Sequence, residues 1–152
     1  MSDIVHRIGV RAPAATALEA FTTLKGLASW WTTHLEGNPL PGGALTFRFP
    51  NTGPSFDVLT SEHPNRVLWR CTGGPDDWIG TSIAIQLVEQ GNETAIVFTH
   101  ADWREQTELM HHCSTQWAYF LIGLKQHLEG GAGYAFGSST YREISDWSPP
   151  RR

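Results

Sequence analysis

Apolar and polar residues alternate over most of the stretch between residues 44 and 100, and this period of two constrains the fold more than any other feature. Successive side chains of a strand point to opposite faces, so the pattern predicts strands with one buried face. The alternating segments are 44–49, 56–61, 66–71, 81–89 and 94–100. One-sided alternation is typical of an antiparallel sheet with one face in water, and it argues against a parallel α/β fold.

A long amphipathic helix is predicted after these strands, from about Gln106 to Glu129, with Gly130 and Gly131 ending it. Its apolar residues recur every three or four positions and form a continuous stripe: Met110, Cys113, Trp117, Leu121, Leu124 and Leu128. At about 1.5 Å per residue the helix spans about 36 Å, which is enough to cross a whole sheet.

The segment before the alternating region adds one strand and short helices. Residues 4–10 alternate and predict a half-buried strand. Pro13 begins a short helix over 14–24, Gly26 stops it, and a further helical turn ends at Trp30-Trp31. The predicted order is therefore strand, short helices, five strands and long helix, which is an α+β fold.

Length and composition predict a single folded domain. The chain has 152 residues, of which 40% are hydrophobic and 17% charged, so it is not intrinsically disordered. We assign residues 1–132 to this domain and 133–152 to a C-terminal tail rich in Gly, Ser and Pro. Four aromatic residues of the tail predict that it folds back onto the body, at least in part: Tyr134, Phe136, Tyr141 and Trp147.

Charge and apolar runs exclude several classes of partner. Eleven Lys and Arg against fifteen Asp and Glu give a net charge of −4, and the basic cluster Arg151-Arg152 is a poor nucleic-acid footprint. The longest apolar run, 119–124, is too short to insert into a membrane. The first residues carry no signal-peptide pattern, so we expect a cytoplasmic protein whose Cys71 and Cys113 are buried, reduced thiols.

Several diffuse motifs are similar to those of one superfamily. They are Trp30-Trp31, Gly42-Gly43 before a strand, Pro64 before Val67-Leu68-Trp69, and the stripe from Trp117 to Glu129. Over residues 4–130 the chain resembles the START-like superfamily, also called SRPBCC, and within it the bacterial homologues of the activator of a heat-shock chaperone ATPase. The resemblance implies a helix-grip fold, in which a curved antiparallel sheet of about six strands wraps around the C-terminal helix over an apolar cavity. Members bind lipids, sterols, polyketides or plant hormones, and some are cyclases or dehydratases.

Large aromatic residues converge between the predicted sheet and helix. Such stripes are typical of a solid core, whereas the cavity that the resemblance implies makes several of them candidates for binding a ligand. Trp78 and Trp103 stand at strand or loop ends, where they can border the mouth of a cavity. The candidate cavity residues are Trp31, Phe47, Phe49, Phe56, Trp69, Trp78, Ile83, Ile85, Phe98, His100, Trp103, Met110, Cys113 and Trp117.

His100 and Asp102 are the candidate catalytic residues. His100 shares a strand face with Ile96 and Phe98 and should point inward, and Asp102 would share that side if the strand continued. An imidazole beside a carboxylate can act as a general base or anchor the polar end of a ligand. The alternative is a structural histidine, hydrogen-bonded at the corner between strand and helix.

We expect no metal and no cofactor. His111 and His112 point away from Cys113 around the helix, and the chain has neither a CxxC nor an HExxH motif. It also lacks a GxSxG nucleophile motif and a phosphate-binding loop.

Three functions follow from these observations. The first is binding of a small hydrophobic or amphipathic ligand, such as a lipid or a polyketide-like or aromatic molecule, between sheet and helix. The second is a cyclase, dehydratase or hydrolase that uses His100 and Asp102. The third is an interaction protein that regulates a chaperone ATPase, as the name of the subgroup suggests. We expect a monomer or a homodimer.

Overall fold

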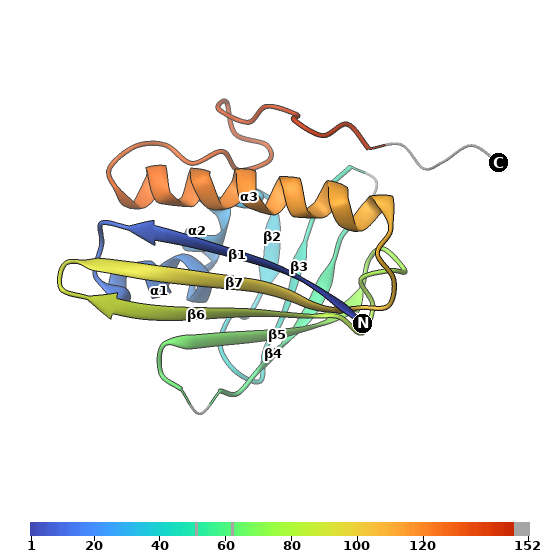
Figure 1. Ribbon diagram of the computed structural model, residues 1–152, viewed down its shortest axis with the longest axis horizontal. Helices are drawn as coiled ribbons and strands as arrows, with labels where there is room; N and C mark the ends of the chain where they lie inside the picture. Colours follow the sequence, from blue (N-terminus) through green and yellow to red (C-terminus); the bar gives the residue numbers. More distant parts are fainter. Residues whose placement is uncertain (51, 62, 148–152) are drawn as a thin grey trace.

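A seven-stranded antiparallel sheet packs against one long helix in the computed structural model, which describes residues 1–50, 52–61 and 63–147 (Figure 1). The strands are β1 (Ser2–Val10), β2 (Leu35–Gly37), β3 (Ala44–Phe47), β4 (Ser55–Leu59), β5 (Arg66–Gly73), β6 (Ser82–Gln90) and β7 (Glu93–Trp103). The helices are α1 (Ala14–Thr22), α2 (Leu24–Ala28) and α3 (Glu108–Leu128). None of these helices is both long and apolar enough to cross a bilayer.

The strand order is β1-β7-β6-β5-β4-β3-β2, so the first strand lies beside the last and the short helices sit in the connection between β1 and β2. This is the predicted α+β helix-grip fold. The sequence predicted about six strands and missed β2, because three residues are too few to show a period. Residues 51, 62 and 148–152, including Arg151-Arg152, lie outside the described residues.

Alternation along the strands creates the core as predicted. In β6, for example, Ile83, Ile85 and Leu87 are buried, whereas Ala84 and Gln86 between them are partly exposed. The buried face of the sheet meets the apolar stripe of α3, where Trp117 is 2% exposed. Each buried large side chain contributes about 1.5–3 kcal/mol, so this layer dominates the stability of the fold.

Hydrogen bonds cap α3 at its start and join it to the edge strand β1 near its end. The hydroxyl of Thr107 caps the helix by accepting from the Met110 N–H at 3.2 Å. At the other end, the Lys125 ammonium donates to the Gly9 carbonyl at 2.6 Å and to the Glu129 carboxylate at 2.8 Å. The free edge of β1 is thereby covered by a helix, as an edge strand requires to avoid pairing with other chains.

Candidate ligand-binding cleft

The space directly between the sheet and α3 is filled by aromatic rings. The ring of Trp31 lies 4.0 Å from that of Phe47 and 4.7 Å from that of Trp117, measured between centroids, and Phe98 lies 4.6 Å from Trp117. Phe47, Trp69 and Phe98 are 0% exposed. Contacts this close leave no room for a ligand among these rings.

A cleft of about 700 Å³ opens beside this packed layer. One wall is the cleft-facing side of α3, formed by Leu109, His112, Cys113, Gln116, Trp117 and Phe120. The opposite wall comes from the loops after β3 and β5 together with the α2–β2 connection, and its residues are Trp31, Phe49, Pro50, Thr52, Pro54, Pro75 and Trp78. The C-terminal segment closes one side with Phe136, Tyr141, Glu143 and Trp147.

The structure divides the predicted cavity residues into two groups. Those that line the cleft are Trp31, Phe49, Trp78, Cys113 and Trp117. Those that do not line it are Phe47, Phe56, Trp69, Ile83, Ile85, Phe98, His100, Trp103 and Met110, all of them buried. For this second group the alternative of a solid core holds, because their rings and branched side chains pack on one another. Trp103 also borders a separate small pocket of about 170 Å³ near the start of α3.

The C-terminal segment supplies cleft residues that the sequence analysis missed. It turns back at the end of α3 and runs over the helix on the side away from β1 (Figure 1). Phe136 anchors it, because its N–H donates to the Trp31 carbonyl at 2.8 Å and its carbonyl accepts from the Thr33 N–H at 2.9 Å. The aromatic residues of the tail were the signal that could have placed it here, since exposed rings have little reason to recur in a free tail.

Gly123 allows this segment to cross α3 closely. A Cβ at Gly123 would lie 2.7 Å from the backbone nitrogen of Tyr134, nearer than Cβ atoms approach other heavy atoms. The ring of Tyr134 stacks on that of Tyr119 at 5.0 Å. The hydroxyl of Tyr119 accepts from the Arg142 N–H at 2.8 Å, which holds the segment further along. A glycine that weakens an isolated helix therefore permits the contact that builds one side of the cleft.

His100 belongs to a closed hydrogen-bond network and not to the cleft. Its Nδ1 accepts from the Trp117 indole N–H at 3.2 Å, so its Nε2 carries the proton and donates to the Thr81 hydroxyl at 2.8 Å. That hydroxyl donates to the Trp78 carbonyl at 2.5 Å. His100 is 0% exposed, and burial lowers its pKa to about 3. It is a neutral structural histidine with both nitrogens satisfied.

Asp102 does not accompany His100, and the prediction that the two side chains share a side is wrong. A bulge in β7 separates them: Ile4 pairs with His100 but Ser2 pairs with Trp103, so β7 contains one extra residue. Asp102 takes a left-handed φ of 71° and its side chain is exposed. Trp103 therefore points inward instead, with its ring 4.8 Å from that of His100.

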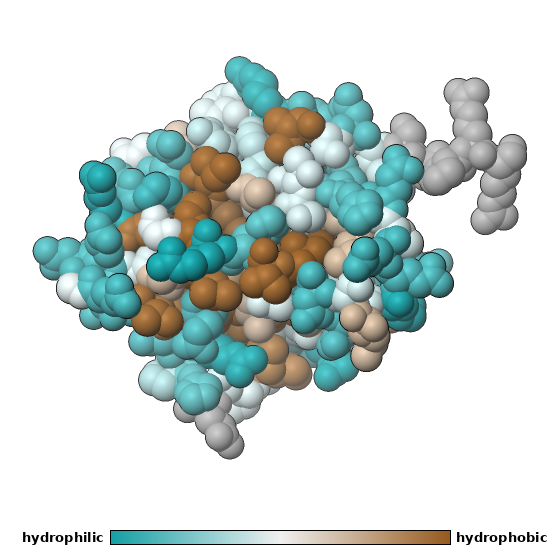
Figure 2. Space-filling model, viewed as in Figure 1, coloured by the Kyte–Doolittle hydropathy of each residue, from teal (hydrophilic) through white to brown (hydrophobic). Residues whose placement is uncertain are grey.

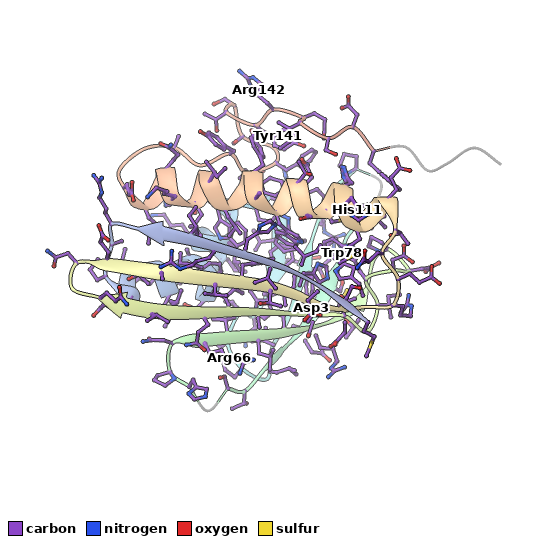
Figure 3. All side chains as sticks on the ribbon, in the orientation of Figure 1. Asp3, Arg66, Trp78, His111, Tyr141 and Arg142 are labelled. Carbon is purple, nitrogen blue, oxygen red and sulfur yellow. The ribbon has the colours of Figure 1, made fainter. Side chains whose placement is uncertain are left out.

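The His111-His112-Cys113 run diverges around α3, as the helical geometry predicts. His111 is exposed near the N-terminal end of the helix (Figure 3). The Nδ1 of His112 lies 2.8 Å from the Ser145 hydroxyl, and its ring packs 5.5 Å from Trp147. Burial raises the pKa of the Cys113 thiol to about 12. Within the described residues, no group of three or more His, Cys, Asp or Glu side chains is arranged to hold a metal ion.

A directional hydrogen-bond chain carries the polar character of the cleft. The Tyr141 hydroxyl donates to the Glu143 carboxylate at 2.7 Å and accepts from the Gln116 amide at 3.4 Å. Burial and this bond to Glu143 raise the pKa of Tyr141 to about 12, so its hydroxyl keeps its proton. The Gln116 amide oxygen is buried and has no hydrogen-bond partner in the described part of the chain. In the view of Figure 3, Tyr141 lies above α3 and Trp78 below it, and both line the cleft.

Comparison with protein families decides the identity of the fold. Residues 11–129 match the family model described as Activator of Hsp90 ATPase homolog 1-like protein. The chain belongs to this family. The predicted START-like resemblance, including its subgroup, is thereby confirmed. Comparison with curated protein sequences gave no significant match.

Solved structures agree with this assignment to the Hsp90-activator homologue family. The Aha1 dimer from Colwellia psychrerythraea is 43% identical, covers 88% of this chain and 100% of its own, and has a TM-score of 0.80. CalU16 from Micromonospora echinospora is 24% identical, with 86% and 76% covered and a TM-score of 0.65. DynU16, a protein of the dynemicin biosynthetic locus, is 17% identical with a TM-score of 0.73, and the match covers 93% of this chain and 51% of DynU16. The last two show the shared fold.

Proposed function

We propose that this protein binds a small, largely apolar molecule in the cleft between α3, the C-terminal segment and the loops after β3 and β5. The observation that carries the proposal is the cleft itself. Its volume of about 700 Å³ falls in the range of small-molecule sites, and aromatic rings with few polar groups line it, as in such sites generally. The family fold supports the proposal because it serves as a scaffold around an apolar site.

The positions of His100 and Asp102 argue against catalysis by this pair, and therefore favour the binding function. A general base must reach the proton that it removes and have a pKa near the working pH. His100 is sealed behind Trp117 and stays neutral, and Asp102 lies on the outside of the bulge. The enzyme hypothesis depended on these two residues acting together, and their positions do not support it.

A neutral fluorescent probe tests the proposal. N-phenyl-1-naphthylamine should bind the parent protein with a rise in its emission and should raise the melting temperature. Leu109→Trp, which places a bulkier side chain in the cleft, should weaken binding strongly. Ile122→Trp makes the same change on the exposed side of α3 and should leave binding unchanged. Absence of binding to the parent, or equal binding to both variants, would contradict the proposal.

Native mass spectrometry supplies an independent check on the same cleft. A bound molecule that survives purification should appear as a mass above that of the chain, and Leu109→Trp should remove it. A retained mass in Leu109→Trp would place that molecule elsewhere.

An apolar patch on the outer face of the sheet favours a second function, contact with another copy of the chain. Figure 2 shows hydrophobic residues gathered over the middle of this face. Val5 on β1 is 57% exposed and Val88 on β6 is 44% exposed. Exposed apolar patches mark interaction surfaces, and the 43% identical Colwellia relative is described as a dimer.

Sedimentation can test this self-association. We expect a homodimer that Val5→Lys dissociates, whereas Leu40→Lys, on the exposed loop before β3, should leave it intact. A monomer at all concentrations would contradict the idea and leave the patch as a surface for a different protein, with the Hsp90-type chaperone as the first partner to test.

A further inference from the structure

The charged side chains that line the cleft differ in number by sign: one is acidic and none is Lys or Arg among the described residues. The acidic side chain is that of Glu143. Arg142 is next in sequence, but its guanidinium donates to the carbonyls of Ser139 and Tyr141. Figure 3 shows Arg142 pointing away from α3. An anionic ligand would therefore meet a negative charge and no lining cation to compensate for it.

The directions of the hydrogen bonds around Glu143 leave its carboxylate as an acceptor. The Tyr141 hydroxyl donates to the carboxylate of Glu143, so the Gln116 amide must donate its N–H to the Tyr141 oxygen. At this end of the cleft the acceptor that can face a ligand is the carboxylate of Glu143, which also accepts from the Ser145 N–H at 3.3 Å. The amide oxygen of Gln116 is buried, and the unpartnered polar atom of Trp78, deeper in the cleft, is a donor. A ligand group that donates several hydrogen bonds complements this arrangement.

Aromatic rings surround the same groups. Tyr141 packs in a stacked arrangement on Phe120, 6.1 Å between centroids, and both line the cleft. Deeper in the cleft, the near-parallel indoles of Trp78 and Trp117 lie 5.9 Å apart. Ring faces attract cations as well as flat apolar molecules. The floor of the cleft therefore suits a planar aromatic body, and its tail side suits a positive charge.

We propose that the cleft selects planar aromatic molecules that carry an ammonium group, with the ammonium beside Glu143 and Tyr141 and the aromatic body against Trp78 and Trp117. This inference rests on the proposed binding function and adds the chemical class of the ligand. By this proposal the cleft differs from a fatty-acid site, because the carboxylate of a fatty acid needs a hydrogen-bond donor or a cation.

Three pyrene probes of matched size test the charge preference: 1-pyrenemethylamine, 1-pyrenemethanol and 1-pyrenecarboxylate. Each is titrated at pH 7 and low salt, with quenching of the tryptophan emission as the readout. We expect the amine to bind about three- to tenfold more tightly than the alcohol, as a partly exposed ion pair with a cation–π contact supplies. The carboxylate should bind more weakly than the alcohol.

Variants assign the preference to Glu143. Glu143→Gln should abolish the difference in affinity between the amine and the alcohol. Asp146→Asn removes an exposed carboxylate from the same segment outside the cleft and should retain the preference. Glu143 and Asp146 are both exposed, so neither change threatens folding.

The outcomes separate this inference from the proposed function. Binding of all three probes with equal affinity, or tightest binding of the carboxylate, would overturn the charge preference and leave a ligand-binding cleft. A preference for the amine that survives in Glu143→Gln would overturn the assignment to Glu143. Failure of every probe, together with failure of N-phenyl-1-naphthylamine, would overturn the binding function itself.

Discussion

The indole N–H of Trp117 donates to the Nδ1 of His100 at 3.2 Å, and this bond joins the middle of α3 to the end of β7. Both side chains are buried, so each would otherwise hide an unsatisfied polar group at a cost of about 1–3 kcal/mol. The bond also fixes the tautomer of His100, because a nitrogen that accepts cannot carry the proton. Its other nitrogen must then find an acceptor, and the Thr81 hydroxyl provides it at 2.8 Å.

Removing that acceptor should destabilise the fold. Thr81→Val keeps the shape of the side chain but leaves the Nε2–H of His100 without a partner, which should lower the free energy of unfolding by about 1–3 kcal/mol. Thr81→Ser retains the hydroxyl and should cost markedly less. Urea denaturation of both variants measures the difference. Equal stability of Val and Ser would show that the bond contributes nothing.

The buried position of His100 predicts a dependence of stability on pH. The unfolded chain binds a proton with a pKa near 6.5, whereas the folded chain binds it only near pH 3. Between these values the unfolded state holds more protons, so the stability due to neutral His100 is complete above pH 6.5 and falls toward pH 3. The slope is at most about 1.4 kcal/mol per pH unit.

Two measurements check this behaviour. The imidazole resonance of His100 should not titrate between pH 4.5 and 8. The stability difference between the parent and His100→Gln should shrink as the pH falls through this range. A titration midpoint near 6.5 would show that His100 reaches solvent and would restore it as a candidate base.

Periodicity predicted the fold because it reports burial directly. The alternation in β6 and the stripe of α3 each state which face is covered, and together they require a sheet against a helix. The alternation predicted the wrong side chain to be buried where the strand is irregular. At the bulge, one extra residue in β7 places Trp103 on the inner side, where the regular alternation predicted Asp102. Asp102 takes a left-handed conformation there, and the apolar–polar pattern does not indicate such a conformation.

The cleft was predicted less well, since it depends on volume and on contacts between distant segments. Trp31 and Trp117 were predicted to converge between sheet and helix, and Trp78 to border the mouth of a cavity, but the sequence does not reveal which rings leave space between them. Phe47 looks like Phe49 in the pattern; Phe47 is 0% exposed in the core and Phe49 lines the cleft. The tail residues were missed because no period relates a crossing segment to the helix beneath it.

Gly123 provides a test of that crossing. Ala is the better helix former by about 1 kcal/mol, so an isolated helix would gain from Gly123→Ala. Here the added Cβ meets the backbone of Tyr134, and we expect a net loss of about 1–3 kcal/mol together with faster amide exchange over residues 133–147. Gly9→Ala is the control, because its Cβ would meet nothing within 4 Å. Unchanged exchange in Gly123→Ala would mean that the segment is not docked.

The two cysteines differ in position, and their reactivity can show whether the cleft admits small molecules. Cys113 lines the cleft and Cys71 lies in β5, outside it. Burial raises the pKa of Cys113 to about 12 and that of Cys71 to about 11. Since the thiolate is the reactive form, both should react with N-ethylmaleimide at pH 8 far more slowly than in the denatured chain.

Access and ionisation predict opposite orders for these thiols. If the thiolate fraction alone set the rates, Cys71 would react faster, because its pKa is the lower of the two. We expect Cys113 to react first, since a small neutral reagent reaches it through the cleft without opening the sheet. Peptide mass spectrometry after timed labelling gives both rates, and 1-pyrenemethanol should slow the labelling of Cys113 while leaving that of Cys71 unchanged. Faster labelling of Cys71 would mean that the β4–β5 side of the sheet opens more readily than the cleft admits a reagent.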